Sequence, residues 1–306
     1  MSTRLSSFVI TTLLCFSLNA QERSTLHQLR CHADSDYVFV AAHRADWKYA
    51  PENSLPGLEH ALFFGADIIE CDVRPTRDGH FVMMHDATVD RMTNGSGTIS
   101  EMSLEELKAL RLKTNWGQST PYQIPTLEEY IETARGRAYL YLDKASIDLP
   151  GQPEGETVCK LLNVLRCKNA LQETIFVLNW PYEKAQRIFG TALDSVVYCP
   201  VVEDGIPNLE AYVEEYIEKL HPACFQFRMA SLESQTYSLL PKVLASGSRA
   251  FVASTWPQHT ANHDDLVSIF QRPSEGWGWL ISQGFSILET NFPKDLIQYL
   301  KSERRH

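Results

Sequence analysis

From residue 37 onward, short apolar runs alternate with longer stretches that carry apolar residues at helical spacing. Most of the runs are continuously apolar, as strands of a parallel sheet covered on both faces should be. Eight such strands are predicted, at 37–42, 67–73, 138–143, 174–178, 195–202, 224–227, 249–254 and 285–289. Because helical patterns separate them, the chain is predicted to be an α/β protein with a TIM (β/α)8 barrel fold.

Capping residues mark where two of the predicted helices begin. Ser54 precedes the first helix, and Pro56 lies in its opening turn, where a missing N–H costs nothing. Thr126 and Glu129 have the spacing of a capping box and start another helix.

Two features go beyond a bare barrel. An extra strand is predicted at 81–84, joined to the second strand by a turn at 77–79. The segment 87–125 is too long for a simple loop and contains its own helix, capped by Ser103 and Glu106. We therefore expect one barrel domain over residues 21–306, with a small inserted lobe at about 87–125.

The first twenty residues have the pattern of a signal peptide. Arg4 precedes 14 uncharged residues, 5–18, and Ala20 is a small residue at the expected cleavage point. The run is too short to span a bilayer as a helix. We expect cleavage before Gln21, export to the periplasm or the medium, and no stable membrane insertion afterwards. The alternative is an uncleaved membrane anchor.

The charge composition of the chain limits the classes of binding partner that are expected. The chain has 28 basic and 38 acidic residues, a net charge of −10, and no basic cluster that could follow a phosphate backbone. Nucleic acid is therefore not an expected partner. The seven cysteines follow no disulfide or metal-binding spacing, so most are expected to be buried free thiols. The oligomeric state is left open.

The candidate chemistry lies where predicted strands end. Glu70 and Asp72 are two residues apart in one strand and so share a face. Asp143 ends the next barrel strand, while His43 and His85 each follow a strand. In a TIM barrel the carboxyl ends of the barrel strands, where His43, Glu70, Asp72 and Asp143 fall, meet at one mouth. Three carboxylates form an oxygen site suited to Mg²⁺ or Ca²⁺ rather than Zn²⁺.

The neighbouring residues suggest what such a site would act on. Two histidines can divide the roles of acid and base near neutral pH. Arg44 and Lys144 add positive charge for an anion. A divalent cation beside an anion site predicts hydrolysis of a phosphoester, so the expected partner is a small phosphodiester.

In these residues the sequence resembles the glycerophosphodiester phosphodiesterase family. The matching motifs are His43-Arg44, 51–54, 65–67, Glu70-x-Asp72, 76–79, His85-Asp86, 90–97 and 124–127. The resemblance implies a TIM barrel with a lobe inserted after the His-Asp motif. It also implies metal-dependent cleavage of glycerophosphodiesters to an alcohol and glycerol phosphate. His43 and His85 would be the acid and base, Glu70 and Asp72 metal ligands, and Arg44 a phosphate contact.

Several positions depart from the family pattern. Ala45 replaces a glycine, and Asp143 stands where a longer glutamate would be the third ligand. Trp256 ends a late strand as in the family, but residues 257–259 differ, and Asn291 replaces an aspartate. These late positions would face the alcohol part of the substrate, so its identity is left open.

Two alternative functions remain. The first is a lipid-cleaving barrel of the phospholipase D or phosphoinositide-cleaving kind, which would need an exposed apolar rim. Tryptophans that could supply one are Trp116, Trp180, Trp256, Trp277 and Trp279. The second is a catalytically silent binding barrel, against which the intact histidines and carboxylates argue.

Overall fold

The structure is a computed structural model that describes Leu29 and residues 36–306. The predicted signal peptide and its cleavage point lie outside these residues, as do Cys15 and Cys31. No helix in the described part is long and apolar enough to cross a membrane. The five cysteines in that part are free, and Cys71, Cys199 and Cys224 are buried.

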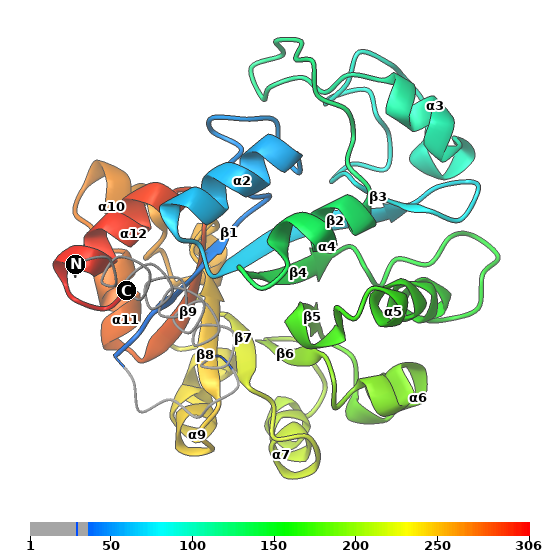
Figure 1. Cartoon of the computed structure of the whole chain (residues 1–306). Coiled ribbons are helices and arrows are strands. Elements are labelled where there is room, and N and C mark those ends of the chain that lie inside the picture. Colours follow the sequence, from blue (N-terminus) through cyan, green and yellow to red (C-terminus); the bar gives the residue numbers. More distant parts are fainter. Residues whose placement is uncertain (1–28, 30–35) are drawn as a thin grey trace, which may run out of the picture.

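Eight parallel strands close into a barrel, which confirms the predicted TIM-barrel fold (Figure 1). Closure is made by β1, which pairs with β2 on one side and with β9 on the other, so that Ala41 lies opposite both Ile68 and Glu289. The barrel strands are β1 (Phe39–Ala42), β2 (Ile68–Pro75), β4 (Tyr139–Asp143), β5 (Thr174–Leu178), β6 (Val197–Glu203), β7 (Cys224–Arg228), β8 (Arg249–Ala253) and β9 (Phe285–Thr290). The extra strand, β3 (Phe81–Met83), pairs antiparallel with β2.

Helices follow the strands around the outside of the barrel (Figure 1). They are α2 (Leu55–Phe64), α4 (Leu127–Ala134), α5 (Glu156–Cys167), α6 (Tyr182–Phe189), α7 (Leu209–Lys219), α8 (Gln235–Ser238), α9 (Leu240–Ala245), α10 (Asp265–Phe270), α11 (Trp277–Ser282) and α12 (Pro293–Ser302). Short 3-10 turns are η1 (Ile99–Glu101), η2 (Leu171–Glu173), η3 (Gly190–Ala192) and η4 (Pro257–His259). Ser54 caps α2 and Thr126 caps α4, as predicted.

Alternating side chains divide the core into two layers. One layer fills the barrel interior and includes Phe39, Ile68 and Ile287. The other lies between the strands and the helices and includes Cys71. Strand side chains alternate, so Glu70 and Asp72 share a face, as predicted; that face is the inward one, and Cys71 faces outward. The last inward position of each strand therefore lies at the mouth of the barrel.

The segment 87–125 lies between β3 and α4 and contains α3 (Leu104–Ala109), whose capping box is formed by Ser103 and Glu106. It has a small apolar core separate from the barrel, lying beside the outer end of β3 (Figure 1). That core consists of Val82, Met84, Val89, Met92, Ile99, Leu107, Leu112 and Ile124. One side of the barrel mouth thus carries an added wall.

Candidate active site

The turn after β1 brings the first candidate residues into place through unusual backbone conformations. Arg44 and Ala45 both adopt left-handed conformations, with φ of 52° and 63°. The main-chain N–H of Arg44 donates a hydrogen bond to Glu70 Oε2 at 2.6 Å. A non-glycine residue in this region is disfavoured by roughly 1–2 kcal/mol. Ala45, which stands where the family pattern has glycine, therefore places backbone strain at the site.

Three predicted metal ligands lie together on neighbouring strands. Glu70, Asp72 and Asp143 each offer a carboxylate oxygen, and these oxygens lie within 4.8 Å of one another. Asp72 and Asp143 face each other in the register of β2 and β4. Glu70 and Asp72 are almost completely buried, and Asp72 Oδ1 has no hydrogen-bond partner. A buried oxygen without a partner is costly, and a bound cation would supply one.

The electrostatics of this cluster also favour a cation. Burial raises the pKa of Glu70 well above its ordinary value, and the adjacent carboxylate of Asp72 raises it further. Burial and the charge of Asp143 raise the pKa of Asp72 in the same way. An all-oxygen donor set fits Mg²⁺ or Ca²⁺, so the residues present fit the predicted ion.

Lys144 lies at the site but its charge is already partnered. Its Nζ is 2.7 Å from Asp143 Oδ2 and 3.9 Å from Asp72 Oδ1. Although burial works in the opposite direction, Lys144 lowers the pKa of Asp143. In this structure Lys144 therefore offsets the carboxylates directly, rather than standing free for an anion as the sequence suggested.

The protonation of His43 follows from its neighbours. Its Nδ1 lies 2.7 Å from Asn291 Oδ1, and Trp47 Nε1 donates to the same atom at 3.0 Å. Because an indole N–H only donates, that amide atom is an oxygen, and His43 Nδ1 must carry a proton. Burial, reinforced by Arg44, lowers the pKa of His43 to about 4. At neutral pH the ring is uncharged, with the lone pair of Nε2 facing Glu70 at 4.0 Å.

Asn291 is held by a buried carboxylate that sequence reasoning missed. Asp265 Oδ2 accepts the main-chain N–H of Asn291 at 2.7 Å. Its Oδ1 accepts from Ser254 Oγ, Trp277 Nε1 and Thr290 Oγ1, all within 2.8 Å. Asp265 stands in the first turn of a helix, where aspartate is common, so its sequence position carried no signal of this role.

His85 lies in a different environment. Its Nδ1 is 2.7 Å from Asp86 Oδ1, and Asp86 in turn accepts hydrogen bonds from Arg91. The main-chain oxygen of His85 accepts a hydrogen bond from Arg74. The side chain is 31% exposed, against 12% for His43. One histidine is thus buried beside an amide, whereas the other is partly open to solvent beside a carboxylate.

A cavity of about 360 Å³ lies beside His43 and Arg44, but its lining does not include Glu70, Asp72, Asp143, Lys144 or His85. His43, Arg44 and Trp256 line it from the barrel, so the structure brings these three predicted residues together. Arg44 Nη1 is 3.2 Å from Glu52 Oε2, and its Nε is 3.7 Å from Asp72. The inserted segment supplies another wall through Arg91, Met92, Thr114, Asn115 and Gly117.

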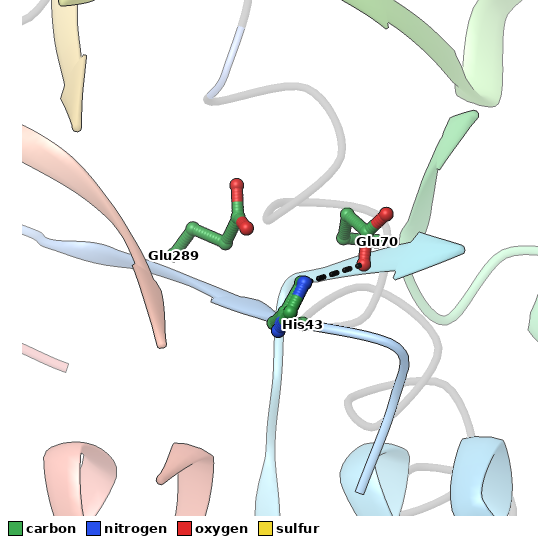
Figure 2. Close-up of side chains that lie close together, drawn as sticks. All are labelled: His43, Glu70 and Glu289. Atoms are coloured by element: carbon green, nitrogen blue, oxygen red, sulfur yellow. Dashed lines mark ion pairs between the residues drawn. The ribbon is translucent and has the colours of Figure 1, made fainter. Parts of the chain in front are cut away.

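The structure adds one carboxylate to the predicted set. Glu289, at the end of β9, lies with His43 and Glu70 so that one donor atom of each is within 4.8 Å of the others (Figure 2). Burial, followed by the charge of Asp143, raises the pKa of Glu289 to about 8. The signal for Glu289 was available, because it ends the last predicted strand just as Asp143 ends an earlier one.

The fold and this site define a TIM barrel with a candidate metal centre at its C-terminal mouth. The sequence profile described as the glycerophosphoryl diester phosphodiesterase family matches residues 43–190, and a domain of unknown function matches residues 198–300. Over residues 43–190, the chain is therefore similar to the glycerophosphoryl diester phosphodiesterase family.

Individual relatives support the same assignment. A glycerophosphodiester phosphodiesterase of Caldanaerobacter subterraneus is 44% identical over 104 residues, which cover 34% of this chain and 43% of the relative. The chain therefore aligns with less than half the length of that relative. A crystal structure of a glycerophosphoryl diester phosphodiesterase from Parabacteroides distasonis has a TM-score of 0.71 at 24% identity and covers 92% of both chains. An Oleispira antarctica phosphodiesterase, in complex with the product sn-glycerol-3-phosphate, has a TM-score of 0.61 at 24% identity and covers 86% of this chain and 96% of its own. These two likenesses establish the fold.

The support of Asn291 by Asp265 can be tested through stability. Asp265→Asn replaces an acceptor oxygen with an NH₂ group, leaving a buried donor unpaired, so we expect a loss of about 1–3 kcal/mol at pH 7 in urea denaturation. Burial raises the pKa of Asp265 to about 6. Its contribution to stability is therefore present below the unfolded pKa and lost as the pH rises through 6.

The stability gap between wild type and variant should consequently widen as the pH falls from 7 to 5. The control is Asp264→Asn, because Asp264 caps α10 through its side chain and asparagine caps helices equally well. A gap that narrows at low pH would contradict this role for Asp265.

Proposed function

We propose that this protein hydrolyses glycerophosphodiesters to an alcohol and glycerol phosphate, using a divalent cation held by Glu70, Asp72 and Asp143. The observation that carries the proposal is the position of the unprotonated His43 Nε2 beside this carboxylate cluster, next to a cavity lined by Arg44. The match of residues 43–190 to the family model supports the reaction class. The glycerol phosphate complex of the Oleispira relative supports the product.

When bound, a divalent cation neutralises charge on the phosphoryl oxygens and orients them. Arg44 is placed to add positive charge near the phosphoryl oxygens as well. Its guanidinium lies between Glu52 and Asp72 and lines the cavity. A phosphate group entering the cavity would meet that guanidinium. This arrangement supports Arg44 as the phosphate contact, while Lys144 balances the charge of the ligands.

The two histidines are suited to opposite proton transfers. His43 is neutral, with its Nε2 lone pair directed into the site, and is assigned as the proton acceptor for the attacking oxygen. His85 is oriented through Nδ1 by Asp86, which leaves Nε2 to protonate the departing alkoxide. Each transfer is worth roughly 10²–10⁴ in rate. Trp256, 45% exposed beside the cavity, is placed to contact the alcohol.

Metal dependence is the first test of this function. Glu70→Gln removes one negative charge without changing side-chain volume, and we expect it to lower turnover of glycerophosphocholine by at least about 100-fold. Chelation of the wild type should do the same, and Mg²⁺ or Ca²⁺ should restore activity. Glu154→Gln is the control, because Glu154 pairs with lysine and arginine on the barrel exterior.

Product analysis should identify glycerol phosphate. Full activity in thoroughly chelated enzyme would exclude the metal mechanism. A preference for lysophosphatidylcholine over glycerophosphocholine would instead favour a lipid-cleaving barrel.

The second test concerns the histidines. His43→Ala and His85→Ala should each lose most of the turnover, and the double variant should lose little more, because the two act as a unit. The pH profile of kcat/KM should be bell-shaped, since one ring must start neutral and the other charged. Wild-type turnover in His85→Ala, measured with the same substrate, would refute the paired mechanism.

We also propose that the protein is exported. The support is the charge and hydrophobicity pattern of residues 1–20 alone. Mass spectrometry of the periplasmic or culture fraction should find a chain beginning at Gln21. A full-length chain retained in the membrane fraction would show that this segment is an anchor.

A further inference from the structure

Glu289 is a buried carboxylate that forms no ion pair with a described residue. It is 5% exposed, and within the described part of the chain no hydrogen bond or ion pair reaches its side-chain oxygens. The charge of Arg228 lowers the pKa of Glu289, but Arg228 Nη1 is 3.0 Å from Glu203 Oε2 and is paired with it. Burying an ionised carboxylate without a partner costs folding free energy. A bound cation at Glu289 would offset that cost.

Two other donors face the same space. Figure 2 shows His43, Glu70 and Glu289, which come from three neighbouring strands, with their polar ends turned toward one another. His43 presents a lone pair there, because its proton is fixed on Nδ1 by Asn291. The three groups thus bring together a nitrogen and two carboxylates, and among residues 36–306 no lysine or arginine forms an ion pair with Glu289.

We propose that His43, Glu70 and Glu289 form a second cation site, adjacent to the site of Glu70, Asp72 and Asp143 and sharing Glu70 with it. A donor set with one imidazole nitrogen and two carboxylates suits Mn²⁺ or Zn²⁺ better than the all-oxygen set does. The two sites therefore differ in the kind of metal they prefer. This inference goes beyond the proposed function, which requires the oxygen site alone.

Comparison with Glu203, a neighbouring strand-end carboxylate, supports the proposed cation site. Glu203 also ends a barrel strand, but its two oxygens accept hydrogen bonds from Asn179 at 2.9 Å and from Arg228 at 3.0 Å. Glu203 is therefore balanced by protein groups, whereas Glu289 is not. The competing arrangement for Glu289 is a protonated carboxyl group without any cation, which the experiment below separates from metal binding.

Occupation of this site would have a chemical consequence for His43. Its Nε2 lone pair serves either as the proton acceptor of the proposed reaction or as a metal ligand, but it cannot do both at once. A cation bound there would therefore remove the base. Excess Mn²⁺ or Zn²⁺ should inhibit an enzyme already activated by Mg²⁺, and Glu289→Gln should relieve that inhibition.

The experiment measures metal binding directly on the full chain. Metal-free protein is titrated with Mn²⁺ alone, and free Mn²⁺ is followed by its paramagnetic resonance signal. We expect two equivalents bound to the wild type and one to Glu289→Gln, with the affinity for the second ion lowered at least about tenfold. Glu203→Gln is the matched control and should keep both ions. Asp143→Asn should weaken the other site and retain this one.

A second measurement does not depend on any variant. In protein labelled with ¹⁵N in histidine, Zn²⁺ binding at this site should shift the Nε2 resonance of His43 and leave its Nδ1 protonated. One Mn²⁺ per wild-type chain, two in Glu289→Gln, or an unshifted His43 Nε2 would overturn the proposal. Because these readouts need no substrate, they are independent of whether the protein cleaves glycerophosphodiesters.

Discussion

The pairing of β1 with both β2 and β9 turns an open sheet into a closed barrel, and the position of each site residue depends on it. Parallel strands bring their carboxyl ends to one mouth, and the alternation of side chains turns His43, Glu70 and Glu289 inward there. His43 and Asn291, whose contact fixes the histidine tautomer, are 248 residues apart in sequence. Without closure, the carboxylates of β2 would still be neighbours, but His43 would lose the amide that sets its protonation.

The closed mouth concentrates negative charge in a place where water is scarce. Burial raises the pKa of Glu70, Asp72 and Glu289. Ionising all three carboxyl groups at once is therefore unfavourable in the folded chain. Lys144 offsets only part of this charge. The backbone is also strained here, since four of the ten described non-glycine residues with positive φ surround the cluster, namely Arg44, Ala45, Asn53 and Lys144. Crowded charge and strained backbone together indicate a site shaped for binding and chemistry at some expense of stability.

Much of this arrangement could be predicted from local pattern. Each barrel strand was expected within two residues of its observed bounds, because continuous apolar runs mark strands buried on both faces. The inward direction of Glu70 and Asp72 followed from alternation. The roles of Asp265 and Asn291 could not be foreseen, because they arise from contacts across the closed barrel that leave no periodic trace in the sequence. The pairing of Lys144 with Asp143 was missed for a related reason, since a strand-end lysine has no fixed direction until the turn adopts its left-handed conformation.

The two profile matches divide the barrel between β5 and β6, and this boundary also divides the chemistry. The first half carries the three clustered carboxylates and both histidines. The second half carries Asp265, Glu289 and Asn291, which set the proton and the surroundings of His43. A protein assembled by exchanging half-barrels between relatives would therefore inherit the carboxylate cluster from one parent and the groups that orient His43 from the other. In this architecture, a change in the half that lacks the recognised motifs is enough to alter the surroundings of His43.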